Sequence, residues 1–368
     1  MLKKCRACNS IDLFLSQVIN NIPLNIWPQK NIKQNNYKKI EIYICKTCGQ
    51  IQIQKLQNIL LNKIYTGNTY NFDNKNQIIY RLKSLKKVYN FKNKKLLDIG
   101  GGTNPFLKYV DEGKKWISDF KINNNLKNNN TKFIKGDFLN KKININFDFV
   151  FLFHTLEHFE NTSFYLKKIH RLLNKEGRLI IEVPNANYDL KKNPYYIFFH
   201  MHITIYKYEN LINFLSLMGF KKDKVFSKKE VLFLSFKKTN LKEKSNYKKL
   251  FLSSKKFIKN VFSSISYIDK FFFKNNSNNI AIFGAGGSTN LFLANSKILK
   301  NKIKYIIDSD KKKENLYLFN NKIRIKKIST HILDNIENLI ILNESHIAHI
   351  PKKYRKKIIN IVDIINGK

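Results

Sequence analysis

Twice along this chain, a short apolar run leads directly into a cluster of glycines. In "KKLLDIGGGTNPF", residues 96–99 precede the glycines at 100–102, and in "NNIAIFGAGGSTN", residues 280–283 precede Gly284 and Gly286. A strand that ends in a glycine turn and continues into a helix lets a ligand approach the backbone, as nucleotides do in doubly wound α/β folds. The sequence therefore predicts two α/β units with Rossmann-like topology.

The first glycine loop has the surroundings of a nucleoside site. Asp98 lies at the end of the predicted strand, and Asn104 and Pro105 are expected to be the N-cap and first residue of a helix. "KKWIS" is expected to be the next strand and to end at Asp119, whose carboxylate could accept hydrogen bonds from both hydroxyls of a ribose. By themselves, the loop and this aspartate suit either a dinucleotide or S-adenosylmethionine.

Two later segments extend this pattern. In "FIKGDFLN", Asp137 could accept a hydrogen bond from the adenine amine while Phe138 stacks nearby. "FDFVFLFHTLEHF" predicts a wholly apolar strand, Phe147 to Phe153, that runs into a helix at residues 154–158. His154 is expected to face the pocket, whereas His158 fits an ordinary helix terminus equally well.

All four cysteines occur in two CxxC pairs, Cys5 with Cys8 and Cys45 with Cys48. Two such pairs can converge tetrahedrally on Zn²⁺, and Gly49 frees the turn after the last cysteine. Two disulfides are the alternative, but they fit a reducing cytoplasm poorly. Because four thiolates leave no position for water, the predicted zinc site is structural.

The chain has 368 residues, a length typical of two or three domains, and a formal net charge of +42. That charge is compatible with nucleic acid, an anionic membrane or phosphate-bearing small substrates. Its lysines are spread along the chain beside abundant Asn and Ile, which favours codon bias over a nucleic-acid footprint. No apolar run approaches a membrane span and the N-terminus lacks a signal-peptide core, so a cytoplasmic protein is expected.

Taken together, "LDIGGGTN", Asp119, "GDF", "FHTLEH" and "LLNKEGRLIIEVPN" resemble the class I S-adenosylmethionine-dependent methyltransferases. Asn104 stands where that family has the third glycine of its loop, which a helix cap would tolerate. A nicotinamide-dependent oxidoreductase is the competing interpretation of the glycine loop. The resemblance implies a donor site made by Asp98, Gly100, Gly102, Asn104, Asp119, Asp137, Phe138 and His154.

The four cysteines in front of this fold, with "NIPLN" and "CKTCGQIQIQ", resemble a narrower family, the sugar C-methyltransferases that act on nucleotide-linked keto-deoxysugars. The resemblance implies three domains: a zinc-binding domain at 1–65, a methyltransferase domain at 66–238, and a helical connector with a Rossmann-like domain at 239–368. In that family the C-terminal glycine loop helps to hold the nucleotide-sugar.

For the second loop, the resemblance implies that Gly284, Gly286 and Asn290 bind substrate, with Asp308 at the next strand end. The more specific interpretation of this glycine loop is a second cofactor-binding site. Because Thr289 occupies the position of a third glycine, internal structural repetition is favoured over it.

The run "FHMH" contains His200 and His202, where the narrower family carries Tyr, His, Glu, His after its fifth strand. The resemblance implies that His202 is the base that removes a proton next to a ketone, with His200 as a second catalytic group. Phe199 and Met201 replace the family's Tyr and Glu. Alternatives therefore stay open: a sugar O-methyltransferase, which needs one base only, an RNA methyltransferase that uses the positive charge, or a donor-binding protein without activity.

Overall fold

The computed structural model describes residues 2–24, 27–30, 37–54, 75–102, 104–120, 131–240, 246–274, 278–296, 302–318 and 323–367. Its contacts divide the chain into two compact units. The first contains residues 1–14, 43–185 and 201–254, and the second contains residues 15–42, 186–200 and 255–368. The cysteine turns therefore share a unit with the first glycine loop, and the expected boundary at 65/66 lies outside the described residues.

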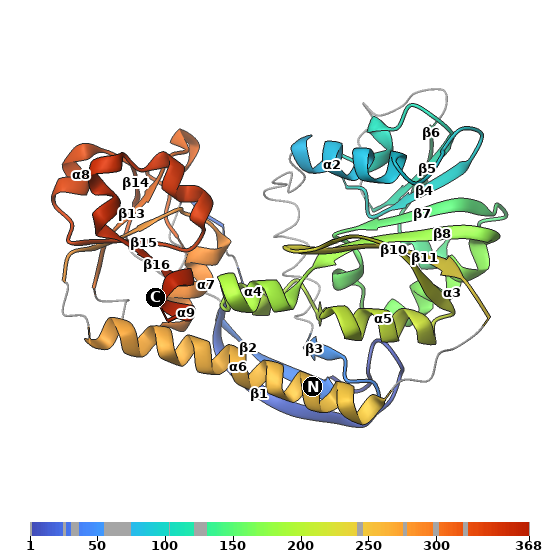
Figure 1. Ribbon diagram of the computed structural model, residues 1–368, viewed down its shortest axis with the longest axis horizontal. Coiled ribbons are helices and arrows are strands. Elements are labelled where there is room, and N and C mark those ends of the chain that lie inside the picture. Colours follow the sequence, from blue (N-terminus) through green and yellow to red (C-terminus); the bar gives the residue numbers. More distant parts are fainter. Residues whose placement is uncertain are drawn as a thin grey trace. The chain divides into compact units, whose positions relative to one another are not determined.

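A seven-stranded sheet forms the centre of the first unit, in the order β10-β11-β8-β7-β4-β5-β6 (Figure 1). The first five of its strands in sequence are parallel, whereas β11 pairs antiparallel with both β8 and β10. The order reverses at β4, so the crevice between the ends of β4 and β7 is the expected ligand site. The strands are β4 (Lys95–Ile99), β5 (Lys114–Asp119), β6 (Thr131–Lys135), β7 (Phe147–Phe153), β8 (Leu173–Pro184), β10 (Phe220–Lys228) and β11 (Val231–Lys238).

Helices cover both faces of this sheet. Figure 1 shows α2 (Lys75–Lys86) on one face, and α3 (Thr162–Leu172) and α5 (Tyr208–Leu217) on the other. Alternate residues of β7 belong to different apolar clusters, since Phe151 packs on the α2 side and Leu152 on the α3 side. A strand buried on both faces is apolar along nearly its whole length, which explains "FDFVFLF", where Asp148 near the start is the one polar residue.

Two helix starts predicted from the sequence are wrong. Asn104 and Pro105 do not begin an α-helix: Pro105 has an extended backbone, Asn104 accepts a hydrogen bond from the Tyr109 hydroxyl, and only the 3-10 turn η1 (Phe106–Tyr109) follows. After β7, His154 adopts a left-handed backbone (φ 47°) that a helix cannot contain. The 3-10 turn η4 (Leu156–His158) follows, and α3 begins only at Thr162.

The cysteine segments accompany a four-stranded sheet in the order β1-β2-β3-β9. Its strands are β1 (Leu13–Pro23), β2 (Tyr37–Cys45), β3 (Ile51–Ile53) and β9 (Thr204–Ile205). Strand β9 follows the histidine run directly and pairs antiparallel with β3. The division between the two units falls within β1 and β2.

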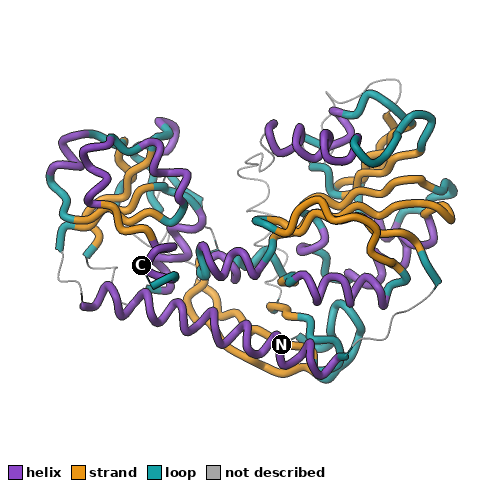
Figure 2. The backbone as a smooth tube through the Cα atoms, in the orientation of Figure 1, coloured by secondary structure: helices purple, strands orange, loops and turns teal. Residues whose placement is uncertain are grey.

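The second unit confirms the predicted repetition of a Rossmann-like topology. Its five-stranded sheet is parallel throughout, in the order β14-β13-β12-β15-β16, and its helices and strands are seen in Figure 2. The strands are β12 (Ile280–Phe283), β13 (Ile303–Asp308), β14 (Ile325–Lys327), β15 (Asn338–Ile341) and β16 (Ile358–Asn360). The predicted α/β fold class is thus confirmed.

The remaining helices are α4 (Ala186–Lys192), α6 (Tyr247–Lys274), α7 (Gly287–Asn295), α8 (Thr330–Asp334) and α9 (Ile361–Ile365). Short 3-10 turns are η3 (Phe138–Asn140), η5 (Tyr196–Phe198), η7 (Lys311–Lys313), η8 (Glu344–His349) and η9 (Lys352–Lys357). Helix α6 confirms the predicted helical connector from residue 247 on, while residues 241–245 lie outside the described part. Within the described residues, no helix combines the length and the apolar character needed to cross a bilayer.

Candidate donor site, histidine cluster and cysteine centre

The glycine loop after β4 lies at the reversal of strand order. Gly100 and Gly102 have positive φ, 78° and 58°. A Cβ on Gly100 would lie 2.4 Å from Thr155, which follows β7, so the loop packs closely on the neighbouring strand end. A Cβ on Gly102 would meet no described atom within 4 Å, so Gly102 is the position where a ligand has room to approach.

Asp119 lies at the end of β5, as the sequence predicts. Its Oδ2 accepts a hydrogen bond of 2.8 Å from the Gly102 backbone N–H. The carboxylate is thereby fixed beside the glycine that has open space, which is the placement that hydrogen bonding to a ribose requires. Asp98 is buried at the end of β4 and lies beneath the loop, with its Oδ2 3.0 Å from the position of a Cβ on Gly101.

We expect Asp119→Ala to weaken the binding of S-adenosylhomocysteine about 10- to 100-fold, because hydrogen bonds to a charged group contribute about 1.5–3 kcal/mol. Isothermal titration of the folded variant would measure this loss. Asp111→Ala, which removes an exposed carboxylate just before β5, is the matched control and should bind as the unchanged protein does. Equal affinity in both variants would contradict the predicted ribose contact.

Asp137 and Phe138 lie after β6, but both already have protein partners. Asp137 Oδ1 accepts hydrogen bonds from the Tyr165 hydroxyl (2.6 Å) and the Leu139 N–H (3.0 Å), so it caps η3. Phe138 is buried, parallel to the Tyr165 ring at 6.1 Å between centroids, with the Lys168 ammonium 4.8 Å from its centroid. The adenine contact of these two residues stays a prediction.

A buried charge network lies beside the loop, and the sequence did not predict it. Arg81 of α2 is wholly buried; its Nη2 and Nε lie 2.5 and 3.0 Å from Glu182 Oε1 on β8. His154 Nε2 lies 3.1 Å from the same oxygen, and its Nδ1 lies 3.5 Å from Glu157. Burial opposes the charge on His154, but the two carboxylates outweigh it and raise the pKa of His154 to about 10. His154 is thus a cation that bridges two buried carboxylates.

His202 belongs to the same unit as the glycine loop after β4. Its ring centroid lies 5.1 Å from that of His158, and both imidazoles lie beside the buried carboxylate of Glu157. Burial opposes ionisation of Glu157, but His154, His158 and His202 together lower its pKa to about 2. The cluster of Glu157, His158 and His202 therefore joins η4 to the segment before β9. Thr155, just before η4, packs against Gly100.

His200 and its aromatic neighbours are placed in the second unit. His200 is 1% exposed, and within the described residues neither ring nitrogen has a hydrogen-bond partner. Burial lowers its pKa to about 4, so the ring is neutral near pH 7. Tyr195 is buried edge-on against Phe292, and Tyr196 stacks on Phe199, so both rings have packing roles. A catalytic role of His200 stays a prediction.

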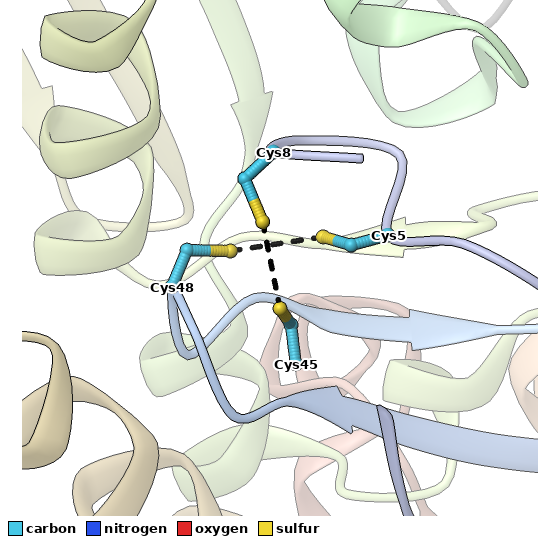
Figure 3. Close-up of side chains that lie close together, drawn as sticks. All are labelled: Cys5, Cys8, Cys45 and Cys48. Atoms are coloured by element: carbon cyan, nitrogen blue, oxygen red, sulfur yellow. Dashed lines mark hydrogen bonds between the residues drawn. The ribbon is translucent and has the colours of Figure 1, made fainter. Parts of the chain in front are cut away.

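The four cysteine sulfurs point toward one another, as Figure 3 shows. The Sγ atoms of Cys5 and Cys48 are 3.6 Å apart, and so are those of Cys8 and Cys45. A tetrahedral Zn–S bond of about 2.3 Å requires sulfurs about 3.8 Å apart, whereas a disulfide requires about 2.05 Å. The geometry therefore fits the predicted four-thiolate zinc site and not two disulfides.

Both cysteine turns are closed by backbone hydrogen bonds. The Gly49 N–H donates to the Cys45 carbonyl (2.8 Å) with φ of 72° at the glycine, and the Asn9 N–H donates to the Cys5 carbonyl (2.9 Å) with φ of 61°. Gln52 Nε2 lies 3.3 Å from Cys5 Sγ, a contact that stabilises a thiolate. Gly49 thus has the positive φ in the turn after the last cysteine that the sequence predicts.

The C-terminal glycine loop repeats the geometry of the glycine loop after β4. Asp308, at the end of β13, accepts hydrogen bonds from the Ala285 N–H (2.7 Å) and the Lys313 ammonium (2.8 Å). A Cβ on Gly284 would lie 2.3 Å from His346, whereas one on Gly286 would meet no described atom within 4 Å. Asn290 is wholly buried in α7. Gly286 is therefore the position with room for a ligand, and substrate binding at this loop stays a prediction.

These observations define a doubly wound α/β unit with a glycine loop at its switch point, where Gly102 has open space beside Asp119. Residues 74–225, less than half of the chain, match the family model described as "Methyltransferase domain". This part of the chain is therefore similar to methyltransferase domains. No curated protein matches the sequence.

Several solved structures are similar to the chain. A 1,6-didemethyltoxoflavin-N1-methyltransferase of Burkholderia thailandensis, solved with S-adenosylhomocysteine, is 14% identical over 52% of this chain and 96% of that chain (TM-score 0.40). PhzM, a pyocyanin biosynthetic protein, is 12% identical over 45% of this chain (TM-score 0.38), and the match spans only 55% of the length of PhzM. A methyltransferase of Clostridium acetobutylicum is 14% identical over 49% and 98% (TM-score 0.36). These scores are low, and the assignment rests on the family match and the site.

Proposed function

We propose that the protein transfers a methyl group from S-adenosylmethionine to a carbon of a nucleotide-linked keto-sugar, with His202 as the base. The observation that carries the proposal is the position of His202 in the donor-binding unit, beside Glu157 and two residues before β9. Glu157 is two residues after Thr155, which packs on the donor loop. The proposed base and the loop proposed to hold the donor thus both lie against the short segment 155–157.

The reaction needs a base because a sugar carbon becomes nucleophilic only as an enolate. A neutral imidazole of His202 would take the proton from the carbon next to the ketone, and the electron pair of that C–H bond would move onto the ketone oxygen. The enolate carbon then attacks the methyl group, and the C–S bond breaks to leave S-adenosylhomocysteine. A nearby carboxylate, here Glu157, stabilises the imidazolium that forms.

The substrate class rests on the sequence resemblance and on the second unit. Gly286 has open space at the switch point of a parallel sheet. At the end of the neighbouring strand, the ammonium group of Lys313 donates a hydrogen bond to Asp308. A glycine turn at a helix N-terminus with an adjacent lysine is a suitable environment for a diphosphate. The structural zinc at the four cysteines is part of the same proposal.

Methylation of a sugar hydroxyl is the second candidate, because Phe199 and Met201 replace the Tyr and Glu of the resembling family. An alcohol needs one base and no stabilised enolate. Met201 carries no charge, but the carboxylate of Glu157 places a negative charge near His202. A carboxylate beside the proposed base supports either reaction, so the preference for C-methylation rests on the sequence resemblance.

The experiment that tests this function is mass spectrometry of nucleotide-linked sugars incubated with the enzyme and S-adenosylmethionine in D₂O. A 4-keto-deoxysugar is compared with its reduced alcohol. Deuterium exchange and methyl gain with the ketone alone are expected. Methylation of the alcohol would make the protein an O-methyltransferase, and no methyl gain with either would contradict the proposed substrate class.

We expect His202→Asn to lower kcat about 10²- to 10⁴-fold, the usual contribution of a general base. Binding of S-adenosylhomocysteine should stay unchanged, since His202 is proposed to act on the acceptor. His331→Asn, which removes an exposed imidazole from α8, is the control and should retain full activity. A His202 variant that keeps its rate of deuterium exchange would contradict the proposed base.

A further inference from the structure

Glu157, His158 and His202 form a second cluster of metal-ligating side chains, separate from the cysteines. One ligand atom from each lies within 4.8 Å of the others. All three residues belong to the first unit. Two imidazoles and one carboxylate are a ligand set that binds Zn²⁺, Fe²⁺, Co²⁺ or Ni²⁺ with positions left open for water.

The tautomer of His158 is fixed by the backbone. Its Nδ1 lies 2.8 Å from the Met201 carbonyl oxygen. Because a carbonyl can only accept, Nδ1 carries the hydrogen. In the neutral ring, Nε2 then presents its lone pair toward Glu157 Oε1, 4.0 Å away. A histidine whose other nitrogen donates to a backbone carbonyl is the usual form of a metal ligand.

The carboxylate of Glu157 is buried and shares its nearest cation with another carboxylate. Its side chain is 1% exposed, and within the described residues neither oxygen has a hydrogen-bond partner. The nearest cationic group is His154 at 3.5 Å, which also serves Glu182. Because His154 is shared with Glu182, a metal ion bound by Glu157 and the two imidazoles would add a second positive charge beside this buried carboxylate.

We propose that Glu157, His158 and His202 bind a divalent transition cation of the zinc class. Metal–ligand bonds of about 2.1 Å require ligand atoms roughly 3.4 Å apart. His158 is 29% exposed and His202 is half-buried. Both rings therefore have room to turn toward Glu157 until the ligand atoms reach this separation. Glu157, held in η4 beneath them, is the fixed ligand.

The cation has a consequence for catalysis, and this consequence rests on the proposed function. A metal bound to His202 occupies the lone pair that would accept the substrate proton. His202 cannot bind the cation and act as the base in the same molecule, so the cation is an inhibitor of the proposed reaction. The binding itself depends only on the three side chains.

The test is Co²⁺ titration of untagged, full-length protein whose cysteines are already loaded with zinc. We expect one further equivalent, with visible d–d bands and without the near-ultraviolet thiolate-to-metal charge transfer that cobalt at the cysteines would give. His158→Asn, at a partly exposed position, and Glu157→Gln should lose these bands, whereas His331→Asn should keep them. Absence of the bands in the unchanged protein, or their persistence in folded His158→Asn, overturns the site.

Methyl transfer measured with and without Zn²⁺ separates this site from the proposed function. Inhibition that disappears in His158→Asn is expected. Cobalt binding without inhibition would uphold the cation site and contradict the role of His202 as base.

Discussion

Replacing Cys48 with serine is expected to remove one equivalent of zinc per chain and to unfold the cysteine segments. Cys48 is 2% exposed, and its sulfur lies 3.6 Å from that of Cys5. Structural zinc contributes about 10–16 kcal/mol in small zinc-binding peptides, because the site does not exist in the unfolded chain. The loss should therefore exceed that of any single packing change in this segment.

The cysteines also pack within an apolar cluster that includes Leu97 and Val150 of the methyltransferase sheet. The thermal midpoint of the donor-binding unit should consequently fall with the loss of zinc. Metal analysis and hydrogen exchange over residues 2–14 and 43–53 measure both effects. Thr47→Ala changes an exposed residue of the same turn and should alter neither. Protein that holds no stoichiometric zinc, or that keeps these amides protected after chelation, would contradict the structural site.

The second large effect is expected from Arg81→Met. This substitution leaves Glu182 buried with His154 as its remaining partner, and breaking a buried ion pair from one side costs about 3–5 kcal/mol. Urea unfolding should show the loss as a lower midpoint. The double variant Arg81→Met/Glu182→Gln removes both charges, so it should recover most of the stability.

Lys86→Met on the same helix is the matched control. Lys86 and Glu112 form an exposed pair at 3.5 Å, and such pairs contribute about 0–1 kcal/mol. Equal losses in the Arg81 and Lys86 variants would mean that the buried network does not stabilise the fold. A double variant less stable than Arg81→Met would contradict the charge balance described here.

The strands around the donor loop could be predicted because local sequence decides them. β7 is apolar except at Asp148, and β5 ends at Asp119 at the spacing that a doubly wound fold requires. The same reasoning predicted β12 and β13 in the second unit. Burial on both sheet faces leaves few alternatives for such runs.

The two wrong helix starts have side-chain causes, a distant one at His154 and a local one at Asn104. His154 takes a left-handed backbone while its ring reaches Glu182 on another strand, and Asn104 is bonded to the Tyr109 hydroxyl. N-cap preferences describe only local backbone groups, so they do not include these side-chain partners.

The buried charges were missed because their partners are far apart in sequence. Arg81 and Glu182 are separated by 101 positions, and His158 contacts Met201 across 43. A signal was present in each case: Arg81 lies in the buried stripe of α2 with Ile78 and Leu85, and Glu182 interrupts the apolar run of β8. A charged residue at a core position predicts a partner without saying which.

The most direct test of the account is isothermal titration of the zinc-loaded protein with S-adenosylhomocysteine and, separately, with NAD⁺. We predict saturable binding of one S-adenosylhomocysteine per chain and no binding of NAD⁺, because we propose that the loop after β4 and Asp119 hold the methyl donor. Saturable NAD⁺ binding, with no heat from S-adenosylhomocysteine, would contradict the assignment and favour an oxidoreductase.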